Sequence, residues 1–147
     1  MPRSQLQTGA QRLLTGLHSA LYRLTDGRVG GKMGNAPMLL LYSTGRKTGK
    51  ERCTPLLFGR DNDRLILIGS NGGNEVHPAW IHNLRNQGRA RVRLGSRTFP
   101  VNVSEARGEE RTRLWKMMVE QFAGYSGYES KTTREIPVVI LTRTEGT

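Results

Sequence analysis

The middle and the end of the chain show short apolar runs that are separated by turn residues. Apolar runs of about four to eight residues, alternating or continuous, are typical of β-strands. The pattern predicts six strands, over residues 38–44, 52–60, 64–70, 89–94, 97–104 and 136–143. Because most connections between them are short, we expect a mainly antiparallel sheet, and a six-stranded sheet of this kind tends to close into a barrel.

Three further segments carry apolar residues at helical spacing, over residues 5–25, 78–87 and 108–122. The second segment begins at a proline and stops before Gly88, as helices often do. The third has an acidic first turn, which the helix dipole favours. We therefore expect an α+β fold, with residues 1–147 in a single domain.

Residues 1–35 are predicted to form an amphipathic helix followed by a glycine-rich linker. The apolar stripe of this helix consists of Leu6, Leu13, Leu14, Leu17, Leu21 and Leu24. One interpretation is that the helix packs on its own domain or on a neighbouring subunit. The other is that the helix, whose polar face is basic, lies on an anionic membrane.

The charge of the chain favours an anionic partner. Lys and Arg number 23 against 12 for Asp and Glu, which gives a formal net charge of +11. Nucleic acid, anionic lipid and a polyanionic small molecule all fit this balance. The single cysteine, Cys53, excludes an intrachain disulfide and suits a reducing cytoplasm. No apolar run reaches the roughly 18 residues of a transmembrane helix, and we expect no secretory signal.

The strongest local charge lies between the first two predicted strands. Residues 46–52 contain four cations, and Gly45 and Gly49 punctuate the stretch. Glycines free backbone N–H groups to point outward, and arginines grip phosphate with two hydrogen bonds. The spacing differs from a nucleotide-binding P-loop, and strand residues follow instead of a helix. A phosphate-bearing cofactor, a nucleic acid and plain solvent remain the alternatives for this turn.

Other common catalytic patterns are missing from the sequence. His18, His77 and His82 have no acidic partners at ligand spacing, so we expect no metal site. No GxSxG motif occurs, and the carboxylates are few and scattered. Cys53 lies two residues before a proline on a strand, which favours a structural thiol over a nucleophile.

Three aromatic residues are candidates for a ligand pocket. Trp80 follows Pro78 beside a glycine-rich loop, where it either belongs to the core or walls a planar ligand. Tyr125 and Tyr128 lie in a second glycine-rich loop, where core aromatics are rare, and they are predicted to flank the mouth of a pocket.

In their order and spacing, these segments resemble the deazaflavin-dependent nitroreductase family over nearly the whole chain. The resemblance rests on residues 43–49, Arg52-x-x-Pro55-Leu56, Ser70-x-Gly72-Gly73, Pro78-x-Trp80-x-x-Asn83-Leu84, Tyr125, Tyr128 and Arg134-x-Ile136-Pro137. It implies a split β-barrel related to the FMN-binding flavin reductases, and the coenzyme F420, an 8-hydroxy-5-deazaflavin. The coenzyme has a phospholactyl oligoglutamate tail, so a polyanion would occupy the basic turn.

The resemblance also implies the residues of the site. The tail and phosphate would contact Arg46, Lys47, Thr48 and Arg52. The ribityl chain and ring would be lined by Cys53, Thr54, Pro55, Leu56, Leu57, Ile68, Gly69, Ser70, Asn71, Ala79, Trp80, Ile81, His82 and Asn83. Trp80 and Tyr125 would border the deazaflavin plane, and Tyr125 and Tyr128 would orient the acceptor or supply a proton.

The implied activity is hydride transfer from reduced F420 to a small electron-poor acceptor such as a quinone or a nitro compound. The chain departs from the family pattern at three positions: Asn71 replaces a lysine, Phe122 replaces a tyrosine and Lys131 replaces a tryptophan. The last two positions lie on the acceptor side, so quinones and other electron-poor conjugated molecules are favoured. An FMN-dependent reductase on the same fold and a basic β-barrel that binds nucleic acid are the alternatives.

We expect a cytoplasmic protein whose partner is the small-molecule acceptor and not nucleic acid. The low aromatic content, 6%, argues against a base-stacking surface. Residues 1–25 are the candidate contact with an anionic membrane, at the inner face of the cell membrane. A homodimer is expected from analogy with other split barrels.

Overall fold

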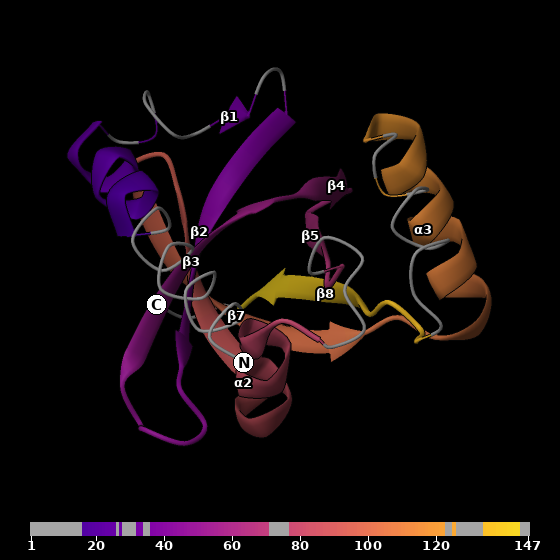
Figure 1. Ribbon diagram of the computed structural model, residues 1–147. Coiled ribbons are helices and arrows are strands. Elements are labelled where there is room, and N and C mark those ends of the chain that lie inside the picture. Colours follow the sequence, from indigo (N-terminus) through magenta and orange to yellow (C-terminus); the bar gives the residue numbers. More distant parts are fainter. Residues whose placement is uncertain are drawn as a thin grey trace, which may run out of the picture.

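The computed structural model describes residues 16–25, 27, 32–33, 36–70, 77–122, 125 and 134–144. In this part of the chain, eight strands form one antiparallel sheet that curls into a half-barrel (Figure 1). The strands are β1 (Lys32–Met33), β2 (Ala36–Thr44), β3 (Glu51–Leu57), β4 (Gly59–Asp61), β5 (Arg64–Ile68), β6 (Arg89–Leu94), β7 (Arg97–Glu105) and β8 (Val138–Arg143). Their order is β1-β2-β6-β7-β8-β5-β4, and β3 pairs with β2.

The prediction of a mainly antiparallel α+β fold is confirmed, although the strands are more numerous than the six expected. The long second strand is divided at Phe58 into β3 and β4. Phe58 is buried, and its backbone N–H donates at 3.3 Å to the carbonyl of Pro37, the residue that the β2–β3 register places opposite it. The short strand β1 adds to the edge of β2 and had no signal in the apolar pattern.

Two helices pack on different parts of the sheet (Figure 1). Helix α2 (Ala79–Gln87) begins after Pro78, and Gly88 closes it in the left-handed conformation at φ 71°, where its N–H bonds the Leu84 carbonyl at 2.7 Å. Helix α3 (Gly108–Gln121) begins with Glu109 and Glu110 in its first turn, as predicted.

The side chains of the sheet separate into two hydrophobic clusters, one on each face. Strand β5 shows the division: Leu65 and Leu67 point into the half-barrel, and Ile66 and Ile68 point to α3. The inner cluster also contains Trp80, Ile81 and Leu84 from α2. The outer cluster contains Leu114 and Met118 from α3. This confirms β5 as a central strand, apolar on both faces.

Residues 16–25 form the described part of the N-terminal helix, and its inward face is not the leucine stripe. Tyr22 is fully buried; its hydroxyl accepts the Gly95 N–H at 2.7 Å and donates to the Arg93 carbonyl at 3.2 Å. Leu17 and Leu24 are 59% and 82% exposed, and Leu21 is exposed as well. The helix therefore packs on its own domain through Tyr22, which hydrogen-bonds the β6–β7 turn, and not through Leu17, Leu21 and Leu24. Residues 1–15, where the start of the helix is predicted, lie outside the described residues.

Candidate functional site

The connection between β2 and β3 is a compact hairpin; together with the first two residues of β3 it is here called the basic turn (residues 45–52). The Gly45 N–H donates to the Lys50 carbonyl at 2.7 Å, and the Gly49 N–H donates to the Gly45 carbonyl at 2.8 Å. Gly49 has φ 70°, which favours glycine. A Cβ at Gly45 would meet the Thr48 Oγ1 at 2.7 Å, so this position has no room for a side chain. The predicted glycine-dependent turn is therefore present.

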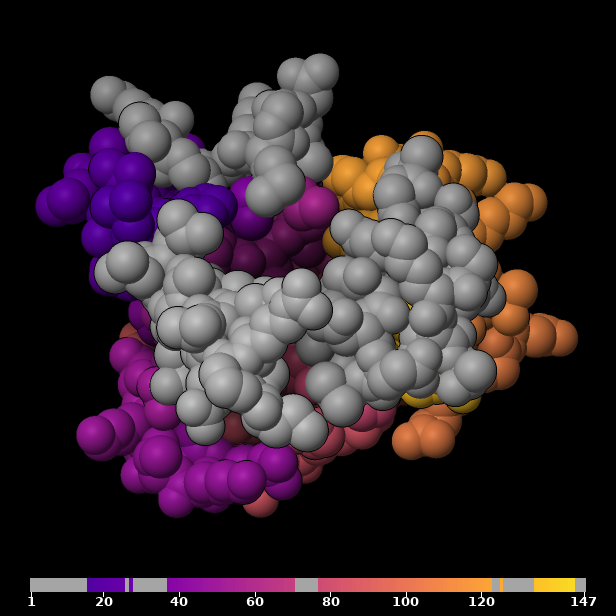
Figure 2. All heavy atoms as spheres, viewed as in Figure 1, coloured from indigo at the N-terminus to yellow at the C-terminus, as the bar shows by residue number. Residues whose placement is uncertain are grey.

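Within the described residues, the cations of the basic turn have no acidic partner. Arg46, Lys47, Lys50 and Arg52 are all exposed, and none of them pairs with a carboxylate of the described residues. The one acid of the turn, Glu51, instead accepts from the Arg91 Nη2 of β6 at 2.5 Å. The turn projects from the body of the molecule at the lower left of Figures 1 and 2. Four cations within seven residues, without an acidic partner in the described part of the chain, form a natural binding site for a multivalent anion.

Helix α2 is joined to the basic turn through a buried amide. The Arg46 N–H donates to the Asn83 Oδ1 at 3.1 Å, and the Asn83 Nδ2 donates to the Ser43 Oγ at 3.3 Å. Asn83 is only 5% exposed, so these bonds are sheltered from water. Beside it, burial lowers the pKa of His82, and the nearby charges of Arg46, Arg85 and Lys47 lower that pKa further. The turn and one face of α2 therefore lie together, as the site prediction requires.

The end of β5 lies against the start of α2. Gly69 and Ser70 are buried, and the Gly69 N–H donates to the Pro137 carbonyl at 2.9 Å. A Cβ at Gly69 would meet the Ile81 Cδ1 at 2.8 Å, so glycine permits this close approach. Three predicted segments, the basic turn, residues 68–70 and residues 79–83, are thus brought together around α2.

Strand β3 supplies the remaining predicted lining residues on the edge next to β2. Its residues Cys53, Thr54, Pro55, Leu56 and Leu57 are half-buried. The Cys53 thiol accepts from the Arg23 Nη1 at 3.4 Å, which brings helix 16–25 next to this strand. Pro55 lies opposite Leu40 in the ladder. Strand β3 is half-buried and apolar, and it continues directly from the cationic turn. One elongated ligand could therefore place an apolar part against the strand and an anionic part against the turn.

The structure places the two described aromatic candidates in different clusters. Trp80 is 6% exposed and packs in the inner cluster with Leu39 and Leu41. Tyr125 is 7% exposed and packs in the outer cluster beside α3, with its ring at 87° to that of Phe122 and 6.0 Å from it. The contacts of these rings with a ligand stay predictions. Asn71 and Tyr128 lie outside the described residues.

Three polar residues that the sequence analysis did not assign lie at this site. Ser43 holds Asn83, and Arg134 reaches His77 and the carbonyls that follow β5. Arg134 belonged to a motif that carried the family resemblance, which was the only signal for it. Ser43 likewise stood in a motif of the resemblance, whereas His77 had no signal, because its partner is distant in the sequence.

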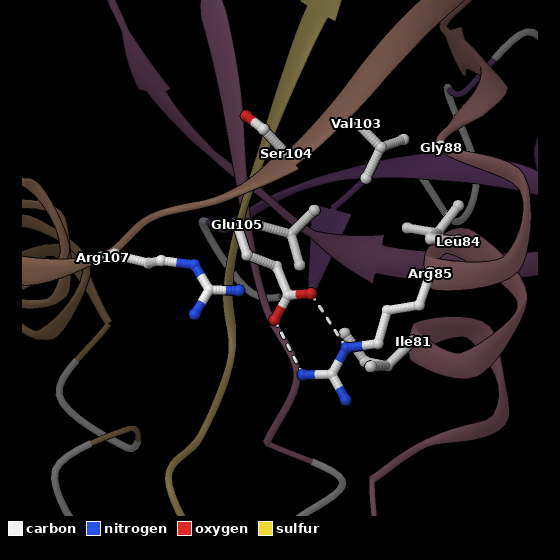
Figure 3. Close-up of a pocket in the computed structure, with 9 residues that line it drawn as sticks. Ile81, Leu84, Arg85, Gly88, Val103, Ser104, Glu105 and Arg107 are labelled. Atoms are coloured by element: carbon white, nitrogen blue, oxygen red, sulfur yellow. Dashed lines mark hydrogen bonds and ion pairs between the residues drawn. The ribbon is translucent and has the colours of Figure 1, made fainter.

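A separate pocket of about 220 Å³ lies between α2 and β7 (Figure 3). On its wall the Arg85 guanidinium donates to both carboxylate oxygens of Glu105, at 2.8 and 2.7 Å. This ion pair lowers the pKa of Glu105, and Arg107 approaches from the other side (Figure 3). Of the residues predicted for the coenzyme, only Ile81 lines this pocket, so it is distinct from the site at the basic turn.

In the described residues, no three His, Cys, Asp or Glu side chains come together as a metal-binding cluster. No helix in the same part of the chain has both the length and the apolar composition to cross a membrane.

Comparison with known proteins gives the chemistry of the relatives. The family model of the F420H(2)-dependent quinone reductases matches residues 14–143. An F420H(2)-dependent quinone reductase of Mycobacterium tuberculosis is 40% identical over 131 residues, which cover 86% of this chain and 88% of the relative.

Two solved structures extend the comparison. An F420-H2 dependent reductase, FDR-A, has a TM-score of 0.66 at 37% identity, over 71% of this chain and 93% of that one. A chain described as a domain-swapped dimer has a TM-score of 0.68 at 32% identity, over 96% of this chain and 99% of that one.

Proposed function

Because the chain belongs to the F420H(2)-dependent quinone reductase family, we propose that it reduces a quinone and that the basic turn holds the tail of the coenzyme. Family membership confirms three expectations: the protein is an oxidoreductase, its coenzyme is F420, and its fold is the split-barrel α+β fold of the F420-dependent reductases. The quinone and the residues that bind each part of the coenzyme are the proposal.

The observation that supports the proposal most is the uncompensated charge of the basic turn. The tail of F420 carries a phosphate and several carboxylates, and Arg46, Lys47 and Arg52 have no carboxylate partner in the described part of the chain. FMN has a phosphate but no oligoglutamate, so it would leave part of this charge unused. The donor set of the turn therefore fits the deazaflavin coenzyme better than it fits FMN.

The reaction requires little acid–base catalysis by the protein. When bound, reduced F420 supplies a hydride, and the quinone takes up this hydride and one proton to become a hydroquinone. The chain must hold the acceptor against the coenzyme and exclude water. The inner cluster with Trp80 provides apolar surface next to α2. Tyr125 and Tyr128 are the proposed residues for orienting the acceptor or delivering the proton.

Binding of F420 and of FMN to the purified protein tests the proposal. Titration is followed by tryptophan fluorescence, since Trp80 is buried in the helix beside the basic turn. We expect tight binding of F420, weak binding of FMN, and hydroquinone formation when reduced F420 and a soluble quinone are added. Preference for FMN would overturn the assignment of the tail, and F420 binding without quinone reduction would overturn the acceptor.

We also propose a homodimer. In the described residues β3 pairs with β2 alone, which leaves its other edge and its half-buried side chains available. A relative at 32% identity is a domain-swapped dimer. Light scattering on the purified protein should give twice the mass of the 147-residue chain, and a monomer at all concentrations would contradict this.

Finally, we propose that the N-terminal helix rests on the inner, anionic face of the cell membrane. Leu17, Leu21 and Leu24 form an exposed apolar face on a chain with a net charge of +11. Quinones with long tails concentrate in lipid, so this contact would bring the enzyme to its acceptor. Vesicles with anionic lipid should retain the protein, whereas vesicles of neutral lipid, or a Leu17→Ser, Leu24→Ser variant, should retain much less. Equal retention by all of them would contradict the proposal.

A further inference from the structure

Arg134 joins three backbone or side-chain acceptors that come from two different elements. Its Nη2 donates to the Ser70 carbonyl at 2.8 Å and to the Gly69 carbonyl at 3.2 Å, directly after β5. Its Nη1 contacts the Nδ1 of His77 at 2.9 Å, just before α2. A guanidinium is planar and offers its donors in a rigid fork, so one side chain sets the spacing of both segments.

The two segments that Arg134 joins are those assigned to the ring and ribityl part of the coenzyme. They already approach closely, because Gly69 has no Cβ to collide with Ile81 of α2. Arg134 is half-buried, and its own segment continues into β8, which is paired with β5. Arg134 therefore links β5, α2 and β8 at one end of the half-barrel.

The contact also determines the proton position on His77. Arginine only donates, so the Nδ1 of His77 must accept, and the neutral ring carries its proton on Nε2. His77 is faced by Arg134, by Arg85 and His82 of α2, and by Glu105 of β7. Burial lowers the pKa of His77, and the nearby cations, Arg134 first, lower it further. The neutral ring is thus the form that this arrangement stabilises.

We propose that Arg134 is a positioning residue of the coenzyme site, which acts by locking the end of β5 and the start of α2 through neutral His77. The inference rests on the proposed function, because it assigns these segments to the coenzyme. Protonation of His77 removes the acceptor at Nδ1 and places two cations in contact. The lock therefore opens in acid, and the two segments lose their fixed spacing.

Coenzyme affinity of the Arg134→Lys variant is the first test. Lysine keeps the charge but cannot reach three acceptors with a rigid fork, so we expect F420 to bind roughly tenfold more weakly. Arg111→Lys is the matched control, because Arg111 donates to the Ile136 carbonyl of the same segment at 2.7 Å from the α3 side. Both variants should keep a wild-type circular dichroism spectrum. Equal affinities of the wild type and Arg134→Lys would overturn the inference.

The role of His77 is tested by the ratio of affinities of the wild type and His77→Asn across pH. The Oδ1 of asparagine takes the place of the Nδ1 acceptor for Arg134 but does not titrate, so affinities should agree near neutral pH. As the pH falls below the ordinary histidine pKa of about 6.5 and reaches the lowered pKa of His77, the wild type should bind more weakly than the variant, since His77 then gains a proton. A ratio that stays constant over this range would exclude His77 as the titrating part of the lock.

Nitrogen NMR of the histidines in the protein without coenzyme separates this inference from the proposed function. We expect the neutral His77 ring to carry its proton on Nε2 in the wild type, and to mix both tautomers in Arg134→Lys. If the wild type shows this tautomer but fails to bind F420, the Arg134–His77 lock is supported and the proposed function is contradicted. If F420 binds and the ring is the other tautomer, the proposed function is supported and the lock is contradicted.

Discussion

Two arginine-rich regions of this molecule use their charge in opposite ways. Where β4 and β5 meet α3, Asp61 accepts from the Arg64 Nη2 at 2.5 Å and from both terminal nitrogens of Arg113, at 2.9 and 3.0 Å. Glu110 adds a contact to Arg64 at 3.3 Å. In the basic turn, Arg46 and Lys47 have no carboxylate partner among the described residues, although the turn contains an acid of its own.

The difference separates charges that hold the fold from charges that serve a ligand. The Asp61 network joins a hairpin to a helix, and its cations are neutralised within the protein. The basic turn is held to α2 by neutral groups, Asn83 and Ser43, so its cations are not needed for packing. Net charge alone, +11 here, does not distinguish these two uses. The ion-pair partners of each charged side chain distinguish them.

The largest effect is expected from the double variant Arg46→Ala, Lys47→Ala. Each cation contributes a charged contact to the tail, and the loss of one such contact weakens binding by about tenfold or more. Affinity for F420 should therefore fall by roughly a hundredfold, while the melting temperature stays near that of the wild type. Fluorescence titration and differential scanning calorimetry measure the two quantities.

The control for this double variant is Arg113→Ala, which also removes an exposed arginine. Because Arg113 of α3 is paired with Asp61 of β4, its loss should leave F420 affinity unchanged and lower the melting temperature. If both variants weakened binding equally, the charge of the whole chain and not the basic turn would attract the coenzyme. The comparison between the two regions would then fail.

A smaller effect on binding is expected from Asn83→Ala. The variant removes the acceptor for the Arg46 N–H and the donor to Ser43 inside a buried contact. The free energy of unfolding should fall by about 1–2 kcal/mol. F420 affinity should fall by about tenfold, since the turn loses its support and keeps its charge. A large loss of stability without loss of F420 affinity would show that the basic turn keeps its binding conformation without Asn83.

Asp61→Asn should affect stability alone. Exposed ion pairs contribute little, but a carboxylate shared by two arginines is a better case, and we expect a loss of about 1 kcal/mol. Asp61 itself is mostly covered, whereas Arg113 is exposed. Coenzyme affinity should not change. Chemical denaturation of the wild type and the variant at neutral pH measures the difference, and a variant as stable as the wild type would show that the network does not stabilise the fold.

Local patterns predicted most of the architecture. Alternation and apolar runs located the long strands, and residues such as Gly88 and Glu109 marked helix ends that the structure confirms within one or two positions. The division at Phe58 was missed because the apolar run of residues 55–58 continues through it. The inward face of the N-terminal helix was misjudged because its contacts are tertiary, and one tyrosine with buried partners outweighed several leucines.

The site was predictable where its chemistry is local in the sequence. The basic turn is one continuous stretch, so its charge and its glycines were visible at once. Asn83 and Arg134 act on residues 37 and 64 positions away, through Arg46 and Ser70. No periodicity reports such contacts. The family resemblance included both positions but assigned no role to Arg134, so its function as a lock required the structure.

The smallest effect concerns the pH dependence of the Asp61 network. The two arginines hold the pKa of Asp61 far below its ordinary value, with the hydrogen bond from Arg113 as the largest cause. A carboxyl with a depressed folded pKa stabilises the protein above its unfolded pKa of about 4, and this contribution is lost as the pH falls towards the folded value. The stability difference between the wild type and Asp61→Asn should therefore be constant from pH 7 to about pH 5. Below about pH 4 it should shrink, because the unfolded chain takes up a proton at Asp61 before the folded chain does. Urea denaturation at a series of pH values measures this difference, and a gap that stays constant to pH 3 would mean that the arginines do not hold Asp61 ionised.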